Sequence, residues 1–142
     1  MKPMSKNADS RRQIQAAHRQ ITALTAKLAT VSGAGEMVAC LRQLGTLMAE
    51  HFADEEQEFD GLHENIRSRS PELQNALHEL AEDHKQLLER VDALLWYAQQ
   101  KHRAASKLRQ LGKQFQERLA RHEARETGIF QDSIWTDLGT AD

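Results

Sequence analysis

The chain has 142 residues, of which 39% are hydrophobic and 28% are charged, and this is the length and composition of one ordinary globular domain. We therefore predict a single domain over residues 1–142. The formal net charge of -2 argues against a basic surface that follows a nucleic-acid backbone. No stretch approaches the roughly 20 apolar residues of a membrane span, and no apolar segment follows the charged N-terminal residues. We expect a cytoplasmic protein that binds neither nucleic acid nor membrane.

The spacing of apolar residues predicts the all-α class. Apolar residues recur at intervals of three and four, and the chain has only two prolines and seven glycines. We predict four amphipathic helices, over about residues 8–30, 36–68, 71–101 and 104–133. Short connections between long helices favour an up-down-up-down four-helix bundle. Cys40 is the only cysteine, which excludes an internal disulfide and a multi-thiolate zinc or iron–sulfur site within one chain.

Each of the first two predicted helices carries histidine on its apolar stripe. The first helix places His18 among isoleucines and leucines, and the glycines of residues 31–35 end it. The stripe of the second helix is interrupted by two polar residues, His51 and Glu55. A glutamate four residues after a histidine lies about one turn along the same face, so both side chains reach the same interior space. The neighbouring acid Glu56 is expected to point elsewhere.

The last two predicted helices repeat this pattern. Ser70-Pro71-Glu72 is a strong start for the third helix, because serine caps free N–H groups and proline fits the first turn. His84 lies in the middle of its leucine-rich stripe, and the fourth helix carries His122 and Glu126 on its apolar face. In antiparallel neighbours, residues equally far from the connecting turn lie at equal height. By this count the histidines and glutamates share one layer.

This layer has the ligands of a dinuclear metal site. Burying six ionisable groups without compensation costs several kcal/mol per ion, and a cation compensates carboxylate and imidazole. Imidazole with carboxylate suits iron, zinc, copper or manganese, and a solvent-derived oxo or hydroxo bridge would bring each of two metals to five ligands. The alternative is a plain bundle in which each histidine has a hydrogen-bond partner. The candidate ligands are His18, His51, Glu55, His84, His122 and Glu126.

Three other histidines are expected on the solvated surface: His63, His78 and His102. A ferritin-like di-iron site would require Glu-x-x-His on two helices. That spacing occurs at none of the four candidate histidines, and Asp60-Gly-Leu-His63 is only an approach to it.

The ordered set His18, His51-x-x-x-Glu55, His84 and His122-x-x-x-Glu126, one group per helix, resembles the hemerythrin-like cation-binding domain over nearly the whole chain. The resemblance implies two non-haem iron ions that meet dioxygen or a related small molecule. It also implies that Glu55 and Glu126 bridge the irons and that the histidines are terminal ligands. We expect His18 to pair with His51, and His84 with His122.

The chain departs from the oxygen-carrying hemerythrins in two respects. Those proteins have a fifth histidine four residues from another on the third helix, whereas Leu80 and Leu88 occupy both such positions around His84. They also close with His-x-x-x-x-Asp, where this chain has His-x-x-x-Glu. Binding, storage or sensing of dioxygen or a related small diatomic molecule is the principal expectation. The alternatives are an enzyme that turns over peroxide or nitric oxide and a regulatory module whose folding depends on iron.

Overall fold

The computed structural model describes residues 3–31, 33–57 and 62–140, and these residues form helices and turns without a strand. The helices are α1 (Pro3–Leu28), α2 (Ala34–Glu56), α3 (Leu62–Arg69), the 3₁₀ turn η1 (Pro71–Leu73), α4 (Gln74–Ala98) and α5 (Ala105–Thr140). The all-α prediction is confirmed. The predicted count of four helices is not, because the described residues form five α-helices and one 3₁₀ turn.

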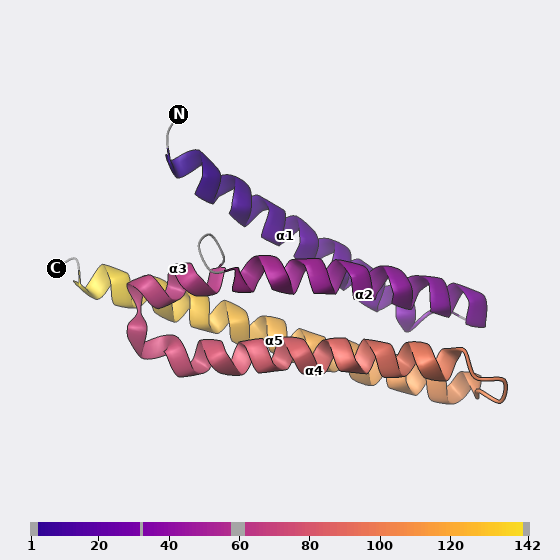
Figure 1. Ribbon diagram of the computed structural model, residues 1–142. Coiled ribbons are helices and arrows are strands. Elements are labelled where there is room, and N and C mark those ends of the chain that lie inside the picture. The colour runs from indigo at the N-terminus through magenta and orange to yellow at the C-terminus, as the bar shows by residue number, and fades with distance from the viewer. Residues whose placement is uncertain (1–2, 32, 58–61, 141–142) are drawn as a thin grey trace.

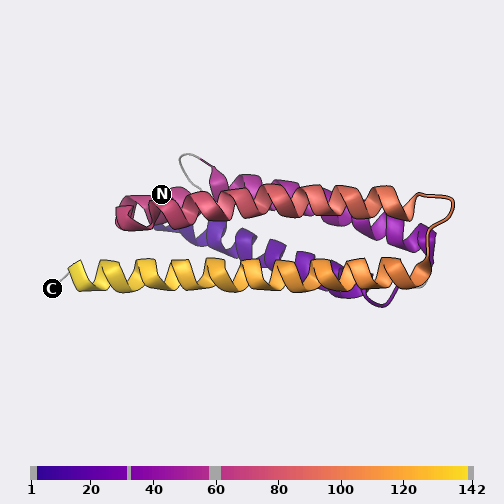
Figure 2. The ribbon, with the colours of Figure 1, turned by 90° about the horizontal axis from the view of Figure 1, so that it is seen from below.

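The four long helices alternate in direction and enclose the interior (Figure 1). α1 packs on α2, α2 on α4, α4 on α5, and α5 on α1, which closes the ring. Figure 2 shows α4 and α5 running in opposite directions from the loop that joins them. The N-terminal part of α1 diverges from the other helices, whereas its C-terminal part lies along them (Figure 1). None of the helices is long and apolar enough to cross a membrane, as far as the described residues show.

The predicted second helix, over residues 36–68, is wrong in one respect, because α2 ends at Glu56 and α3 begins at Leu62. Gln57 ends α2 in an extended conformation, with ψ 134°. The last turn of α2 contains acidic residues and no basic one, an unfavourable arrangement at the negative end of a helix dipole. The acid-rich sequence that favoured the metal site therefore also favours an end to the helix. Because of this interruption, α3 is a helix separate from α2.

The start of the third predicted helix also differs in detail. Pro71 begins a 3₁₀ turn, and the α-helix itself begins at Gln74. Ser70 does not cap this turn with its side chain. Its hydroxyl instead donates a hydrogen bond of 3.5 Å to the carbonyl of Ser133, which ties this corner to α5. The corner thus depends on a contact between segments far apart in the sequence.

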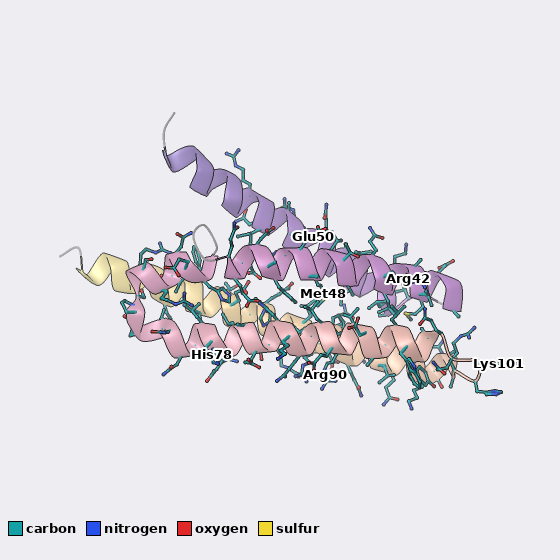
Figure 3. All side chains as sticks on the ribbon, viewed as in Figure 1. Arg42, Met48, Glu50, His78, Arg90 and Lys101 are labelled. Atoms are coloured by element: carbon teal, nitrogen blue, oxygen red, sulfur yellow. The ribbon has the colours of Figure 1, made fainter. Side chains whose placement is uncertain are left out.

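Two apolar clusters form the core. The larger one includes Leu41, Leu44 and Met48 of α2 and receives side chains from all four long helices. Figure 3 shows Met48 between α2 and α4, whereas His78 points away from the interior. The smaller cluster contains Ile66, Leu77, Leu80 and Ile129. Along α4 and α5, His84, His122 and Glu126 lie between residues of the larger cluster and residues of the smaller one. The polar layer is therefore flanked by apolar packing on both sides.

Candidate metal centre

The six predicted ligands come together in this layer. α1 contributes His18, α2 contributes His51 and Glu55, α4 contributes His84, and α5 contributes His122 and Glu126. Five of the six are almost completely buried, and Glu55 has no exposed surface. The His18 side chain retains 31% of its accessible surface. His18 on α1 is therefore the most exposed residue of the layer.

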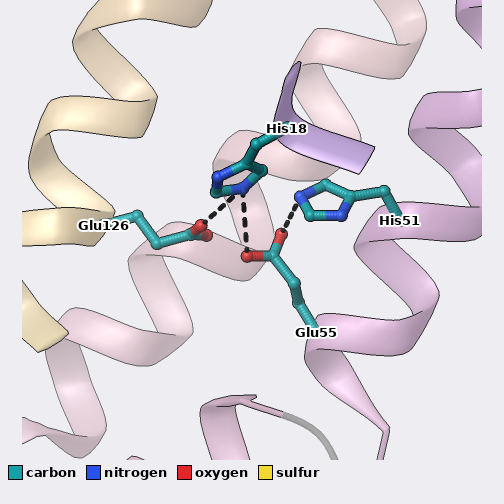
Figure 4. Close-up of side chains that lie close together, drawn as sticks. All are labelled: His18, His51, Glu55 and Glu126. Carbon is teal, nitrogen blue, oxygen red and sulfur yellow. Dashed lines mark ion pairs between the residues drawn. The ribbon is translucent and has the colours of Figure 1, made fainter. Parts of the chain in front are cut away.

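One side of the layer is formed by His18 and His51, whose ring centroids are 4.4 Å apart (Figure 4). His51 Nε2 lies 3.1 Å from Glu55 Oε1. His18 Nε2 lies 3.7 Å from Glu55 Oε2 and 3.3 Å from Glu126 Oε1. Two imidazoles thus face two carboxylates that come from different helices.

The other side is formed by His84 and His122, with ring centroids 4.7 Å apart. His84 Nε2 lies 3.5 Å from Glu55 Oε1 and 3.5 Å from Glu126 Oε2. His122 Nε2 lies 3.6 Å from the same Glu126 oxygen. Phe52 stacks on the His84 ring at a centroid distance of 3.9 Å and an interplanar angle of 4°, which fixes the plane of this imidazole.

The two carboxylates lie between the histidine pairs. Glu126 turns Oε1 toward His18 and Oε2 toward His84 and His122. Glu55 turns Oε2 toward His18, while its Oε1 approaches both His51 and His84. Each carboxylate can therefore reach a ligand position on either side of the layer, which is the arrangement that two neighbouring cations would share.

The pKa values of the side chains in the layer are shifted in opposite directions. Burial lowers the pKa of His18, but the nearby carboxylates of Glu126 and Glu55 outweigh it and raise that pKa to about 10. Burial raises the pKa of Glu55 to about 8, with a further contribution from its contact with Glu126. Burial likewise acts to raise the pKa of Glu126, but contacts with Glu55 and three histidines hold it below the usual range. Burial lowers the pKa of His51 to about 4. Without a metal, these four side chains therefore differ widely in pKa, and protons are distributed unevenly among them.

The buried polar atoms test whether a cation fits this layer. Both side-chain nitrogens of His51, Nε2 of His84 and Nε2 of His122 lack hydrogen-bond partners, and so do all four carboxylate oxygens of Glu55 and Glu126. An unsatisfied buried polar group costs about 1–3 kcal/mol. Nitrogen and oxygen lone pairs that converge without donors are suited to a metal ion. Ligand atoms of His18, His51, Glu55 and Glu126 lie within 4.8 Å of one another, so these residues fit a metal site.

The structure corrects the expectation that His63 is a surface residue. His63 has only 4% of its surface exposed, and its ring centroid is 5.5 Å from that of His84. Ligand atoms of His63, His84 and Glu126 form a second group within 4.8 Å. His63 belongs to α3, which the sequence periodicity merged with α2, so its direction could not be read from the stripe. The surface positions expected for His78 and His102 are confirmed.

Two further carboxylates contact the Nδ1 atoms of the histidines on the second side of the layer, His84 and His122. His84 Nδ1 lies 2.7 Å from Glu56 Oε2, and His122 Nδ1 lies 3.4 Å from Asp83 Oδ2. Arg125 in turn pairs with Asp83 and Glu79. A carboxylate on one ring nitrogen fixes the tautomer and leaves the other nitrogen free to bind metal. The expectation that Glu56 points elsewhere is wrong, because its carboxylate contacts His84 of the layer. This contact was not predicted, since it depends on the neighbouring helix.

The single cysteine, Cys40, belongs to the larger apolar cluster. Cys40 is buried, and its thiol donates to the carbonyl of Leu24 at 3.4 Å. Trp96 is 64% exposed. Neither residue is part of the metal layer.

Comparison with known proteins supports the same interpretation. The sequence matches the family model of the hemerythrin HHE cation-binding domain over residues 9–132. No curated protein and no solved structure matches it significantly. The matched region contains all six predicted ligands and His63. The chain belongs to the hemerythrin HHE cation-binding domain family.

Proposed function

We propose that this protein holds two non-haem iron ions, bridged by Glu55 and Glu126 and by an oxo or hydroxo group, and that it binds dioxygen or a related small diatomic molecule there. The observation that carries the proposal is the position of the carboxylates. Glu126 presents one oxygen to each histidine pair, and all four carboxylate oxygens lack hydrogen-bond donors. His18 and His51 would be terminal ligands on one side, with His84 and His122 on the other.

The charge and ligand type of the layer favour iron in such a role. Imidazole and carboxylate ligands suit iron, and the single cysteine lies outside the layer. When bound, iron supplies reversible one-electron chemistry and coordination positions for a small molecule. Apolar clusters flank the layer on both sides, and the contact between Glu56 and His84 orients one imidazole. These features are those of a single-domain protein that holds its metals firmly and admits small ligands, in the cytoplasm by our prediction.

Access to the layer is open beside α1. His18 is the one predicted ligand that is not buried, with 31% of its side chain exposed, whereas His51 and His84 each retain 2%. A small molecule from solvent would therefore meet the His18 and His51 side first.

Oxygenation of the reduced protein tests this function. Protein loaded anaerobically with iron(II) is exposed to dioxygen, and its visible spectrum is recorded before and after degassing. We expect a charge-transfer band that appears with dioxygen and disappears on degassing, and no band in Glu126→Ala. Catalytic consumption of peroxide or nitric oxide without a reversible band would assign an enzyme instead. A folded protein that takes up no iron would contradict the proposal.

A further inference from the structure

His63 carries an unexplained polar atom at the edge of the metal layer. Its Nε2 is buried and has no hydrogen-bond partner, and the residue is 4% exposed. One ring nitrogen of His63 lies within 4.8 Å of ligand atoms of His84 and Glu126. Metal–nitrogen bonds of about 2.1 Å place two ligands of one ion roughly 3–4 Å apart. The three atoms are thus close to the separation that a common ion requires.

Among the residues that the structure describes, Nε2 of His63 has no hydrogen-bond partner. The neighbouring imidazole, His84, already uses Nδ1 in its contact with Glu56, and its Nε2 is itself unsatisfied. The Glu126 oxygens also lack donors. Two unpaired imidazole nitrogens beside an unpaired carboxylate oxygen are compensated together by one cation.

We infer that His63 is a fifth histidine ligand, which binds the metal on the His84 and His122 side of the layer. The inference rests on the proposed function, because it requires a metal in this layer. It assigns the ligand to α3 rather than to α4, where Leu80 and Leu88 flank His84. Leu80 is fully buried in the smaller apolar cluster together with Ile66 of α3, so the helix that brings in His63 packs against the leucine.

The consequence is an asymmetric centre. Three imidazoles serve the His84 and His122 side, whereas two serve the side of His18 and His51. With two shared carboxylates and one solvent bridge, a metal on the first side would have six ligands and a metal on the second side would have five. A small molecule would then bind at the metal held by His18 and His51, on the side where His18 is 31% exposed.

Counting the metal-bound imidazoles of the unaltered protein tests the inference directly. Cobalt(II)-loaded protein, labelled with ¹⁵N-histidine, gives a strongly shifted, solvent-exchangeable N–H resonance for each imidazole that binds cobalt. We expect five such resonances in the fully loaded protein. Four resonances would overturn the inference and leave the proposed function standing. Failure to bind cobalt or iron at all would instead overturn the proposed function.

Variants separate a ligand from a packing residue. In His63→Ala and His63→Gln we expect one of the two iron-binding steps to weaken by about tenfold or more, with the other unchanged, and imidazole added to His63→Ala to restore it. His122→Ala is the positive comparison, and His78→Ala, at an exposed position of α4, is the matched control. Unchanged affinity at both steps in folded His63→Ala would overturn the inference. If His63→Ala fails to fold, the resonance count in the unaltered protein decides.

Discussion

The apolar cluster around Leu44 and the polar layer around Glu126 are buried to nearly the same extent, yet burial acts on them in opposite directions. Leu44 is fully buried and Glu126 is 3% exposed. Removing apolar surface from water stabilises the fold by roughly 25 cal/mol per Å². Removing unpaired carboxylates and imidazoles from water costs several kcal/mol per ion. One set of helices thus supports a core that is stable by itself and a layer that needs a cation.

The largest expected effect comes from removing the carboxylate that faces both histidine pairs. Glu126→Ala deletes the two oxygens that approach His18, His84 and His122. We expect loss of both metals, measured as iron per chain after anaerobic loading. Glu117→Ala, at an exposed position of the same helix, should retain both irons. Full iron content in Glu126→Ala would show that this carboxylate is not shared.

Leu44→Ala should have the converse effect. Leu44 is fully buried in the larger cluster, so its truncation leaves a cavity and should lower the free energy of unfolding by about 2–5 kcal/mol. Its position outside the polar layer predicts an unchanged number of irons per chain. Denaturant unfolding, followed by helical circular dichroism, measures the first quantity, and metal analysis measures the second. Loss of iron from the folded variant would mean that the two regions are not separate.

A smaller effect is expected from the carboxylate behind His84. Glu56→Gln replaces the carboxylate, 2.7 Å from His84 Nδ1, with a weaker hydrogen-bond acceptor. Loss of such a partner typically weakens metal binding by about 10–100-fold. We expect a shift of this size in the weaker iron-binding step, with the iron content at saturation unchanged. Glu50→Gln, at an exposed position of α2, is the matched control, and equal affinity in both variants would remove Glu56 from the site.

The sequence predicted most of what depends on one helix at a time. The apolar stripes are enough to find the four long helices, because each buries one face, and the polar interruptions are enough to find the six candidate ligands. Contacts that depend on the path between helices were not predictable in the same way. His63 was misplaced because periodicity alone cannot show where one helix ends and the next begins. Glu56 was missed because its partner, His84, lies on another helix.

The central claim is that one chain holds two metal ions in the polar layer between the two apolar clusters. Anaerobic titration of the metal-free protein with iron(II), followed by direct iron analysis of the separated protein, tests it most directly. We predict saturation at two irons per chain. We also predict a higher melting temperature, since a ligand that binds only the folded state stabilises it. Saturation at one iron, or no uptake by a folded protein, would contradict the claim.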